Sequence, residues 1–405
     1  MPRSPLATAP TAGLAATRAG VRATYLAFIA TGFAFASWAS EIPQVRDRLQ
    51  LSSAELGLVL LAIAAGSVIA LPLAGPIVGR IGSRRTVQLV SVLCGLALVG
   101  IGLGYLGGVG PVVVGLFFFG FAQGAWDVAM NVQGAVVERR AGRAIMPRFH
   151  AGFSVGTVAG ALSGAALRAL HVPVTAHLVA VAVVVVAVVP LGVRGFVPDA
   201  EEVTEAGGEA PARRSALAAW KEPRTLLVGL FVLAFAFAEG TGNDWTSVAL
   251  IDGYGTSQVV GILGFATFLT AMTLGRWFGP QLLDRYGRVV VCRVMAAASV
   301  AGLLVFVFGQ HPALAFAGAV LWGAGLSLGF PVGMSAGADE PAHAASRVSV
   351  IASIGYVAFL GGPPLIGFLG EHVGVLRALT AVAVLLALSV AIAGTVRPLP
   401  GDDER

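Results

Sequence analysis

Charged residues are scarce in this chain of 405 residues, because only 12% of them are Asp, Glu, Lys or Arg. Soluble domains carry about a quarter. Hydrophobic residues make up 57% of the sequence and collect in long runs. This composition excludes an ordinary soluble domain and indicates an integral membrane protein.

Cysteine is almost absent, and both cysteines, Cys94 and Cys292, fall inside apolar runs without CxxC or metal-ligand spacing. We therefore expect no disulfide framework and no metal site. Neither an HExxH motif nor an Asp-rich lipid-phosphate motif occurs, so we expect no enzyme and no cofactor. The net charge of +5 does not indicate nucleic acid binding, because the basic residues lie at the ends of apolar runs rather than in a patch.

Runs of about 20 apolar residues, the length that crosses a bilayer, occur twelve times along the chain. Several loops between them are very short, which favours antiparallel neighbours. The sequence therefore predicts an all-α membrane protein with twelve transmembrane helices. Their approximate bounds are 24–43, 54–78, 86–107, 110–137, 149–170, 173–195, 224–250, 257–283, 289–309, 312–337, 348–370 and 373–396.

Most of the 26 Lys and Arg residues fall on the cytoplasmic side if both termini are placed there. This asymmetry follows the positive-inside rule and predicts a multi-pass protein of the cell (inner) membrane. A polar segment, 197–223, predicts a flexible cytoplasmic linker. It separates an N-terminal half from a C-terminal half. A cytoplasmic tail is expected at each end, and the N-terminal tail is expected to be disordered. The halves are 24–196 and 224–397, and the tails are 1–23 and 398–405.

The two halves resemble each other at an offset of about 204 residues, as duplicated transporter halves do. Gly79-Arg-Ile-Gly-Ser aligns with Asp284-Arg-Tyr-Gly-Arg, and Gly152-Phe-Ser-Val aligns with Gly355-Tyr-Val-Ala. Duplicated six-helix halves place a binding site between them near the midplane of the membrane, reached from each side in turn.

The basic loop that begins at Gly75 and reads Gly-Pro-Ile-Val-Gly-Arg-Ile-Gly-Ser-Arg-Arg resembles the G-x-x-x-D-R-x-G-R-R signature of the major facilitator superfamily. The resemblance implies two six-helix halves and a cytoplasmic latch that gates transport. Gly79 occupies the Asp position of the first copy, so the latch there is in doubt. The matching residues are Arg80, Arg84, Asp284 and Arg285.

Asp127 lies in the middle of the fourth apolar run, with Gln123 one helical turn before it and Asn131 one turn after. The three side chains share one helix face, which cannot face lipid because a carboxylate at bilayer depth is costly. A low dielectric favours the neutral form of a carboxylate, so Asp127 is a candidate for proton coupling. Gln123 and Asn131 are candidates for binding a solute.

Two longer stretches around Asp127 resemble the fucose permease group, which are proton-coupled sugar symporters. Trp126-Asp-Val-Ala-Met-Asn and the downstream Phe149-His-Ala-Gly-Phe-Ser-Val-Gly match its E-x-x-x-N and F-x-x-x-G pattern, with Asp in place of Glu. The resemblance implies that Asp127 is a protonatable coupling residue. Glu41 matches the first-helix carboxylate of that group only by its helix. Nearly the whole chain also resembles a bacterial inner-membrane subgroup of transporters without an assigned substrate.

The seventh span carries Glu239 and Asn243 one turn apart, and the glycines between them weaken the helix. Interrupted helices often mark transporter binding sites. We therefore expect Glu239 to couple protons and Asn243 and Trp245 to bind the solute. Asp244 is either part of this site or a structural partner.

Several other residues keep two interpretations open. Trp38 stacks on a sugar ring or anchors the helix at the interface, and Tyr356 lines the site or is a tolerated polar residue. Glu41 lines the path or ends a helix in water. Arg276 takes part in gating with a buried partner or extends to the interface, and His150 relays protons or only ends a helix.

The sequence favours a secondary transporter that moves a small polar solute, such as a sugar or a sugar derivative, together with protons by alternating access. Its expected partners are this solute, protons and the lipid bilayer, and a monomer is expected. An alternative is an exporter that moves an amphipathic compound or drug in antiport with protons. Sodium remains an alternative coupling ion. A membrane enzyme or a sensor is a third class, which lacks a supporting motif or domain. The glycines and proline of the tenth span predict a kink.

Overall fold

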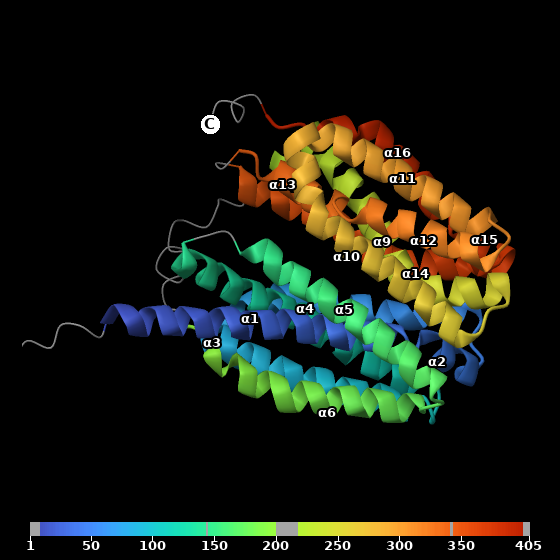
Figure 1. The fold of residues 1–405 in the computed structure, drawn as a ribbon, viewed down its shortest axis with the longest axis horizontal. Coiled ribbons are helices and arrows are strands. Elements are labelled where there is room, and N and C mark those ends of the chain that lie inside the picture. Colours follow the sequence, from blue (N-terminus) through green and yellow to red (C-terminus); the bar gives the residue numbers. More distant parts are fainter. Residues whose placement is uncertain (1–8, 143–144, 200–217, 341–342, 400–405) are drawn as a thin grey trace, which may run out of the picture. The chain divides into compact units, whose positions relative to one another are not determined.

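A computed structural model describes residues 9–142, 145–199, 218–340 and 343–399. Every regular element in these stretches is a helix and none is a strand, which confirms the all-α prediction (Figure 1). The α-helices are α1 (Ala9–Ala39), α2 (Ile42–Leu49), α3 (Ser53–Gly104), α4 (Val109–Ala141), α5 (Met146–Ala169), α6 (Val174–Gly192), α9 (Pro223–Tyr254), α10 (Gln258–Tyr286), α11 (Arg288–Phe308), α12 (Pro312–Leu326), α13 (Gly329–Gly337), α14 (Ala344–Val373), α15 (Val375–Ala378) and α16 (Thr380–Ile392).

Within the described stretches, ten helices are long and apolar enough to cross a membrane. One of them, α3, has 52 residues, which would make a straight helix about 78 Å long. The hydrocarbon layer is only about 30 Å thick. However, α3 contains a break at Gly82, whose φ is 82° and ψ is 157°. The predicted spans 54–78 and 86–107 lie on either side of this break.

Gly287 forms the same kind of break between α10 and α11, with φ 77° and ψ 161°. A positive φ with an extended ψ is open essentially only to glycine. Gly82 and Gly287 occupy the same position in the two aligned basic motifs. The sequence repeat therefore has a counterpart in backbone conformation.

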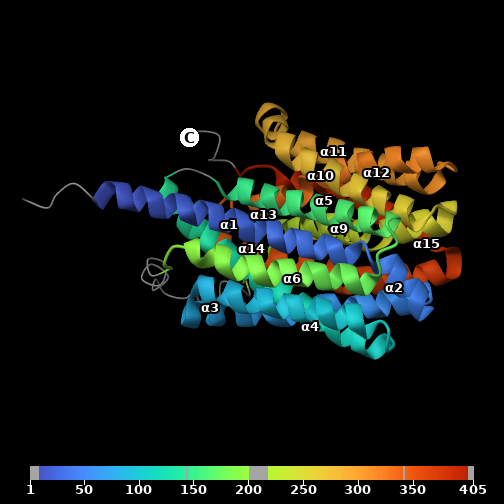
Figure 2. The ribbon, with the colours of Figure 1, turned by 60° about the horizontal axis from the view of Figure 1, so that its bottom comes forward.

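Small residues allow α1 and α5 to pack in close contact. A Cβ atom at Gly32 of α1 would overlap the backbone carbonyl of Phe153, and one at Gly156 of α5 would overlap that of Ile29. Both views show the two helices side by side (Figures 1 and 2). In lipid, where the hydrophobic effect does not drive helices together, such close van der Waals contact is a main source of association.

The predicted kink of the tenth span is confirmed as a break between two helices. α12 ends at Leu326, and α13 begins at Gly329. A Cβ at Gly329 would overlap the ring of Phe235 on α9, and one at Gly333 would overlap Val232. The glycines therefore serve close packing as well as the break, and the gating role of this span remains a prediction.

Contacts divide the chain into two compact units. Unit 1 comprises Met1–Ser37, Ala65–Gly160 and Thr175–Gly208, and unit 2 comprises Trp38–Ala64, Ala161–Val174 and Glu209–Arg405. The unit boundaries fall inside α1, α3 and α5, because two segments that precede the linker belong to unit 2. In unit 2, α9 packs against α10, α12, α13, α14, α15 and α16.

Two predicted boundary segments differ from the structure or lie outside it. The N-terminal tail was expected to be disordered as far as residue 23, but α1 begins at Ala9, so its second part is helical. Most of the predicted linker, residues 200–217, lies outside the described residues. The same holds for most of the tail 398–405.

Asp199, which follows α6, caps the second part of α3. Its Oδ2 accepts a hydrogen bond from the backbone N–H of Ser83 at 2.5 Å, and its Oδ1 accepts one from the Ser83 hydroxyl at 2.7 Å. Because Ser83 follows the Gly82 break, its N–H has no acceptor one turn earlier in a continuous helix. The carboxylate also faces the positive end of the helix dipole.

Glu222 and Arg347 join the start of α9 to the start of α14. Arg347 donates from Nε to Glu222 at 2.6 Å and from Nη1 to Glu340 at 2.8 Å. Burial alone raises the pKa of Glu222, but hydrogen bonds from Arg347 and Thr225 outweigh it and hold the pKa below its ordinary value. This pair therefore stabilises the fold most when Glu222 is ionised.

We expect Asp199→Ala to lower the free energy of unfolding by about 1 kcal/mol, the usual cost of a lost helix cap. Thermal unfolding of the purified protein in detergent measures the change. Asp284→Ala is the matched control, because Asp284 is exposed at the equivalent break and has no hydrogen-bond or ion-pair partner among the described residues. Equal melting temperatures for Asp199→Ala and the wild type would contradict the capping role.

Arg347→Gln should lower the melting temperature at neutral pH, and its difference from the wild type should shrink in acid. The contribution of a depressed carboxylate is fully present above its unfolded pKa of 4.5 and is lost as the pH falls through the folded value. Melting curves of both proteins between pH 7 and pH 3 measure this difference. A difference that stays constant over the whole range would show that Glu222 does not depend on Arg347.

Candidate transport site

Asp127 of α4 is an exposed carboxylate in unit 1 that has no positively charged partner among the described residues. Its hydrogen-bond donor is the Asn131 side chain, which donates to Oδ1 at 3.1 Å and to the Asp127 backbone carbonyl at 2.8 Å. The neighbours Ala125, Trp126 and Ala129 are buried. Asp127 therefore keeps most of its hydrogen-bonding capacity open to water or to a bound molecule.

Gln123, the third member of this face, has a different position from the other two. Its Oε1 accepts a hydrogen bond from the hydroxyl of Thr31 on α1, and its Nε2 donates to the Thr31 carbonyl at 3.2 Å. Gln123 is thus occupied in joining α1 to α4. The structure brings Asp127 and Asn131 together, and Gln123 lies beside them with its amide already bonded.

Glu239 of α9 pairs with Arg276 of α10 in unit 2. Arg276 Nη2 donates to both carboxylate oxygens of Glu239 at 2.8 Å. The two side chains are 22% and 20% exposed for Arg276 and Glu239, respectively. The sequence left two interpretations of Arg276. The structure shows the carboxylate partner that the first of them requires.

A polar stripe on α9 surrounds this ion pair. Glu239, Asn243 and Asp244 are partly exposed, whereas the apolar residues on either side of them in the sequence are buried. Asn243 Oδ1 has no hydrogen-bond partner among the described residues. Because polar groups at bilayer depth do not face lipid, this stripe is expected to line a water-filled path.

The neighbouring helices of unit 2 continue the polar stripe. α10 adds Thr270 and Thr273, whose hydroxyls bond to carbonyls of their own helix and keep acceptor lone pairs free. α14 adds Ser353, which is exposed, and Tyr356, which is partly buried and packs against Phe359 with ring centroids 6.2 Å apart. The two helices that pack against α9 therefore carry further hydroxyl groups, which suit a molecule rich in oxygen atoms.

The two predicted tryptophans are buried in the protein. Trp38 is 2% exposed and Trp245 is fully buried, so neither ring has a face open to a solute in this conformation. Their indole nitrogens have no acceptor among the described residues. Packing explains both residues better than stacking on a sugar.

Glu41 and His150 also differ in position. Glu41 is 3% exposed between α1 and α2, so the interpretation as a solvated helix end does not hold. His150 is exposed near the start of α5, and its ring packs edge-on against Phe28 at 5.1 Å. The geometry therefore leaves His150 accessible to water and places Glu41 in the interior of unit 2.

The residues of the basic motif form fewer contacts than their resemblance implies. Arg84 bonds to the carbonyl of Phe196, and Arg285 lies over the ring of Tyr286 at 5.2 Å. Arg80 and Asp284 are exposed without an ion pair in the described part of the chain. The gating role of all four residues remains a prediction.

A different cluster, absent from the sequence predictions, provides the ion pairs at the motif end of unit 2. Asp339 is almost fully buried and accepts from Arg288 at 2.6 Å and from Arg224 at 2.8 Å. Arg288 is the last residue of the aligned second motif, so the sequence could have identified it as a candidate for an ion pair. Its partner follows α13 in a short polar segment that hydropathy treats only as a loop.

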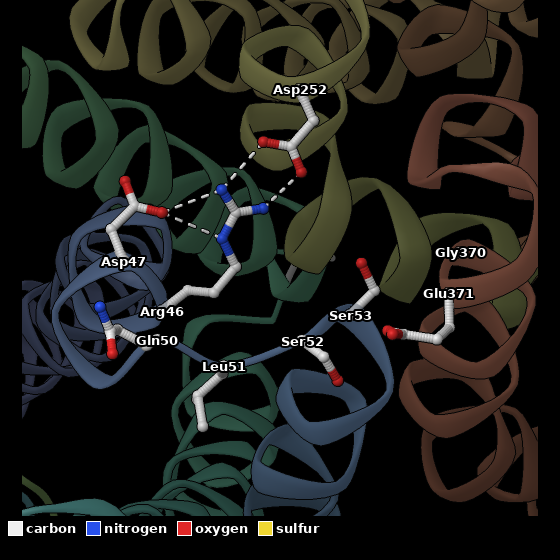
Figure 3. A pocket seen from close by; sticks show the side chains of 9 residues that line it. All are labelled: Arg46, Asp47, Gln50, Leu51, Ser52, Ser53, Asp252, Gly370 and Glu371. Carbon is white, nitrogen blue, oxygen red and sulfur yellow. Dashed lines mark hydrogen bonds and ion pairs between the residues drawn. The ribbon is translucent and has the colours of Figure 1, made fainter.

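A polar cavity of about 590 Å³ lies at the other end of α9, in unit 2. Figure 3 shows Arg46 of α2 between two carboxylates: it forms a two-pronged contact with Asp252, at 2.5 and 2.9 Å, and also bonds to Asp47. Gln258 of α10 donates to Asp47 at 2.8 Å. Because the Arg46 donors are already bonded, the cluster joins α2 to α9 and α10 rather than offering a free binding site. The cavity is lined by Arg46, Asp47, Gln50, Leu51, Ser52, Ser53, Asp252, Gly370 and Glu371.

Known proteins with this fold and sequence are membrane transporters. Residues 23–363 match the family model of the Major Facilitator Superfamily. The chain is 32% identical to an uncharacterized transporter of Sinorhizobium fredii over 85% of this chain and 89% of the relative. It is also 32% identical to an uncharacterized MFS-type transporter of Yersinia pestis, over 92% and 94% of the two chains.

Solved structures give the same result for the fold. The nucleoside transporter NupG superposes with a TM-score of 0.71 at 17% identity, over 93% of this chain and 98% of the other. A bacterial homologue of the lysosomal transporter Spinster, in an inward-facing conformation, superposes with a TM-score of 0.72 at 14% identity, over 98% and 100% of the two chains. The family match over residues 23–363 and the two relatives at 32% identity show that this chain belongs to the Major Facilitator Superfamily.

Proposed function

We propose that the protein is a proton-coupled secondary transporter that moves a small polar solute by alternating access. The observation that carries this proposal is Asp127, an exposed carboxylate at bilayer depth without a positive partner among the described residues. A carboxylate paired with arginine is held in its ionised form, whereas an unpaired one can gain and lose a proton as its surroundings change. Asp127 is therefore the first candidate for the coupling site.

The proposed topology has twelve crossings in two six-helix halves with both termini in the cytoplasm. Two facts support twelve rather than ten crossings. α3 has the length for two crossings, one on each side of Gly82, and α5, with 24 residues, has the length for another. The similar breaks at Gly82 and Gly287 support the duplicated halves. The distribution of Lys and Arg supports the orientation in the inner membrane.

The proposed transport step couples protonation to access. When the site faces the proton-rich side, Asp127 binds a proton and loses its charge, which lowers the cost of enclosing it in the protein. After the site opens to the other side, the proton and the solute leave. Asn131 donates to Asp127 and is positioned to contact both the carboxylate and the solute. Sodium in place of the proton is an outcome that the experiment below distinguishes.

We expect Asp127→Asn to lose the accumulation that the proton on this residue drives, while leaving exchange of solute across the membrane intact. The amide cannot carry a proton, but it preserves the size and most of the hydrogen bonds of the carboxyl group. One proton per solute at Asp127 contributes about tenfold accumulation for a gradient of one pH unit, and the variant should accumulate less than the wild type by this factor. Uptake into proteoliposomes measures both quantities, after a thermal-shift screen of sugars and metabolites selects the solute.

Glu55→Gln is the matched control, because it removes the charge of an exposed carboxylate in the first turn of α3 that has no predicted role in transport, and it should accumulate solute like the wild type. The same vesicles with a sodium gradient at constant pH separate the two ions. Counterflow by Asp127→Asn shows that the variant is folded. Undiminished accumulation by Asp127→Asn under a pH gradient would remove this residue from the coupling mechanism.

A further inference from the structure

Arg276 has more hydrogen-bond donors than the protein uses. A guanidinium carries five N–H groups, and the contacts of Arg276 with Glu239 involve Nη2 alone. Nε and Nη1 therefore contribute three donors that have no acceptor among the described residues. Both oxygens of Glu239, in contrast, are already bonded to Arg276.

This imbalance selects the kind of molecule that fits the site. An amine or another cation can still reach the second lone pair of each Glu239 oxygen, but it would lie beside the positive charge of Arg276. An acceptor can first approach the free donors of Arg276, and an anionic acceptor then competes with Glu239 for the guanidinium. The side chain is 22% exposed, so water can reach these donors, and an oxygen-rich group of a solute can replace that water with hydrogen bonds of its own.

The surroundings of the ion pair favour an anionic group over a neutral one. Charge-assisted hydrogen bonds to a carboxylate or phosphate are about twice as strong as those between neutral groups. The side chains of Arg276 and Glu239 are 22% and 20% exposed, so a small molecule can reach them. Thr273, one turn away on α10, adds a hydroxyl to the same region.

We propose that Arg276 is the receptor for an acidic group of the transported solute, and that this group displaces Glu239, which binds a proton as it leaves Arg276. The solute is thus an organic acid, for example a sugar acid, rather than a neutral sugar. This inference rests on the proposed transport function and names the substrate class of that site. The charges balance, because the incoming anion replaces the carboxylate of Glu239 and the proton neutralises the latter.

Few other charged groups can compete for Arg276 in the described part of unit 2. On α9, Asp244 follows Glu239 by five residues, and α14 carries Tyr356. Arg46, Arg288 and Arg347 on α2, α11 and α14 are bonded to Asp252, Asp339 and Glu222. Arg293 of α11 is exposed, α12, α13 and α16 carry no charged residue, and Asp284 and Arg285 lie at the far end of α10.

The test compares acids with neutral molecules of the same shape. D-glucuronate and D-glucose form one pair, and benzoate and benzyl alcohol form a second, each added to the purified protein at pH 5.5 and pH 7.5. Melting temperature is the readout, since a ligand that binds the folded state stabilises it in proportion to its occupancy. For the wild type we expect a saturable rise of about 2 °C with the acids at pH 5.5. We expect a smaller rise at pH 7.5 and none with the neutral partners.

Glu239→Gln is the informative variant, because it leaves Arg276 without its own carboxylate. It should bind the acids at both pH values with equal affinity. Arg276→Gln in the Glu239→Gln background should weaken binding by about tenfold or more, the usual loss for a charge-assisted contact. Arg276→Lys in the same background keeps the positive charge but not the planar guanidinium. Its affinity for the acids should lie between those of Glu239→Gln and the variant with both glutamines. If Glu239→Gln does not fold, two comparisons still test whether Arg276 binds the acids. They are the wild type at the two pH values and the variant that carries both Glu239→Gln and Arg276→Gln.

The proposal is overturned if neither acid stabilises the wild type at pH 5.5 or Glu239→Gln more than its neutral partner does. It is also overturned if Arg276→Gln takes up a neutral solute under a pH gradient as well as the wild type does. That second outcome leaves the transport function intact, because accumulation would still depend on Asp127. Loss of accumulation in Asp127→Asn bears only on coupling, so the two proposals fail separately.

Discussion

A polar group inside a bilayer must find its partner within the protein, and this requirement explains how the helices are joined. An unpaired hydrogen-bonding group in hydrocarbon costs several kcal/mol. Gln123 meets the requirement by bonding to Thr31, and Arg276 meets it by bonding to Glu239. Each contact joins two helices, α1 to α4 and α9 to α10. Polar residues therefore either join two helices or take part in function. The two roles differ in how many hydrogen-bonding groups of the residue remain without a partner in the protein.

Asp127 and Arg276 stand out by this measure. Asp127 has one amide partner and no positive charge nearby among the described residues, and Arg276 has one carboxylate partner and three unused donors. The remaining charged clusters are more fully bonded. Arg46 forms four hydrogen bonds with two carboxylates, and Asp339 is held by two arginines. Full bonding is what a structural joint needs, whereas incomplete bonding at bilayer depth is justified only if a proton, an ion or a solute completes it.

Hydropathy predicted the helices closely, because crossing a membrane needs a long apolar segment and little else. The predicted span 110–137 lies within α4, and 257–283 corresponds to α10 within a few residues. The kink of the tenth span followed from its glycines and its proline. The start of α1 was placed too late, since its first turns contain Pro, Thr and Arg residues that hydropathy scores as a tail. The break at Gly82 was visible only as a motif glycine, and its conformation required coordinates.

The site itself was only partly predictable. Spacing along one helix correctly grouped Asp127 with Asn131, because residues four apart share a face. Spacing along one helix does not predict contacts between helices. Asp199 lies 116 residues from Ser83, and Asp252 lies 206 residues from Arg46. Burial was also hidden, since Glu41 and Trp38 occur at a helix end where the sequence pattern is the same for an exposed and an enclosed side chain. A single chain carries no signal for such pairings.

The pairing of Glu239 with Arg276 changes what coupling requires at this site. A proton that binds Glu239 alone would take away the negative partner of Arg276 and put nothing in its place. An acid that binds Arg276 alone would lie beside the negative charge of Glu239. Only the two together exchange one anion for another and neutralise the displaced one. Mutual dependence of this kind is a coupling free energy between proton and solute, which is reciprocal by thermodynamic necessity. The same ion pair that holds α9 to α10 can thus enforce coupling when the solute binds.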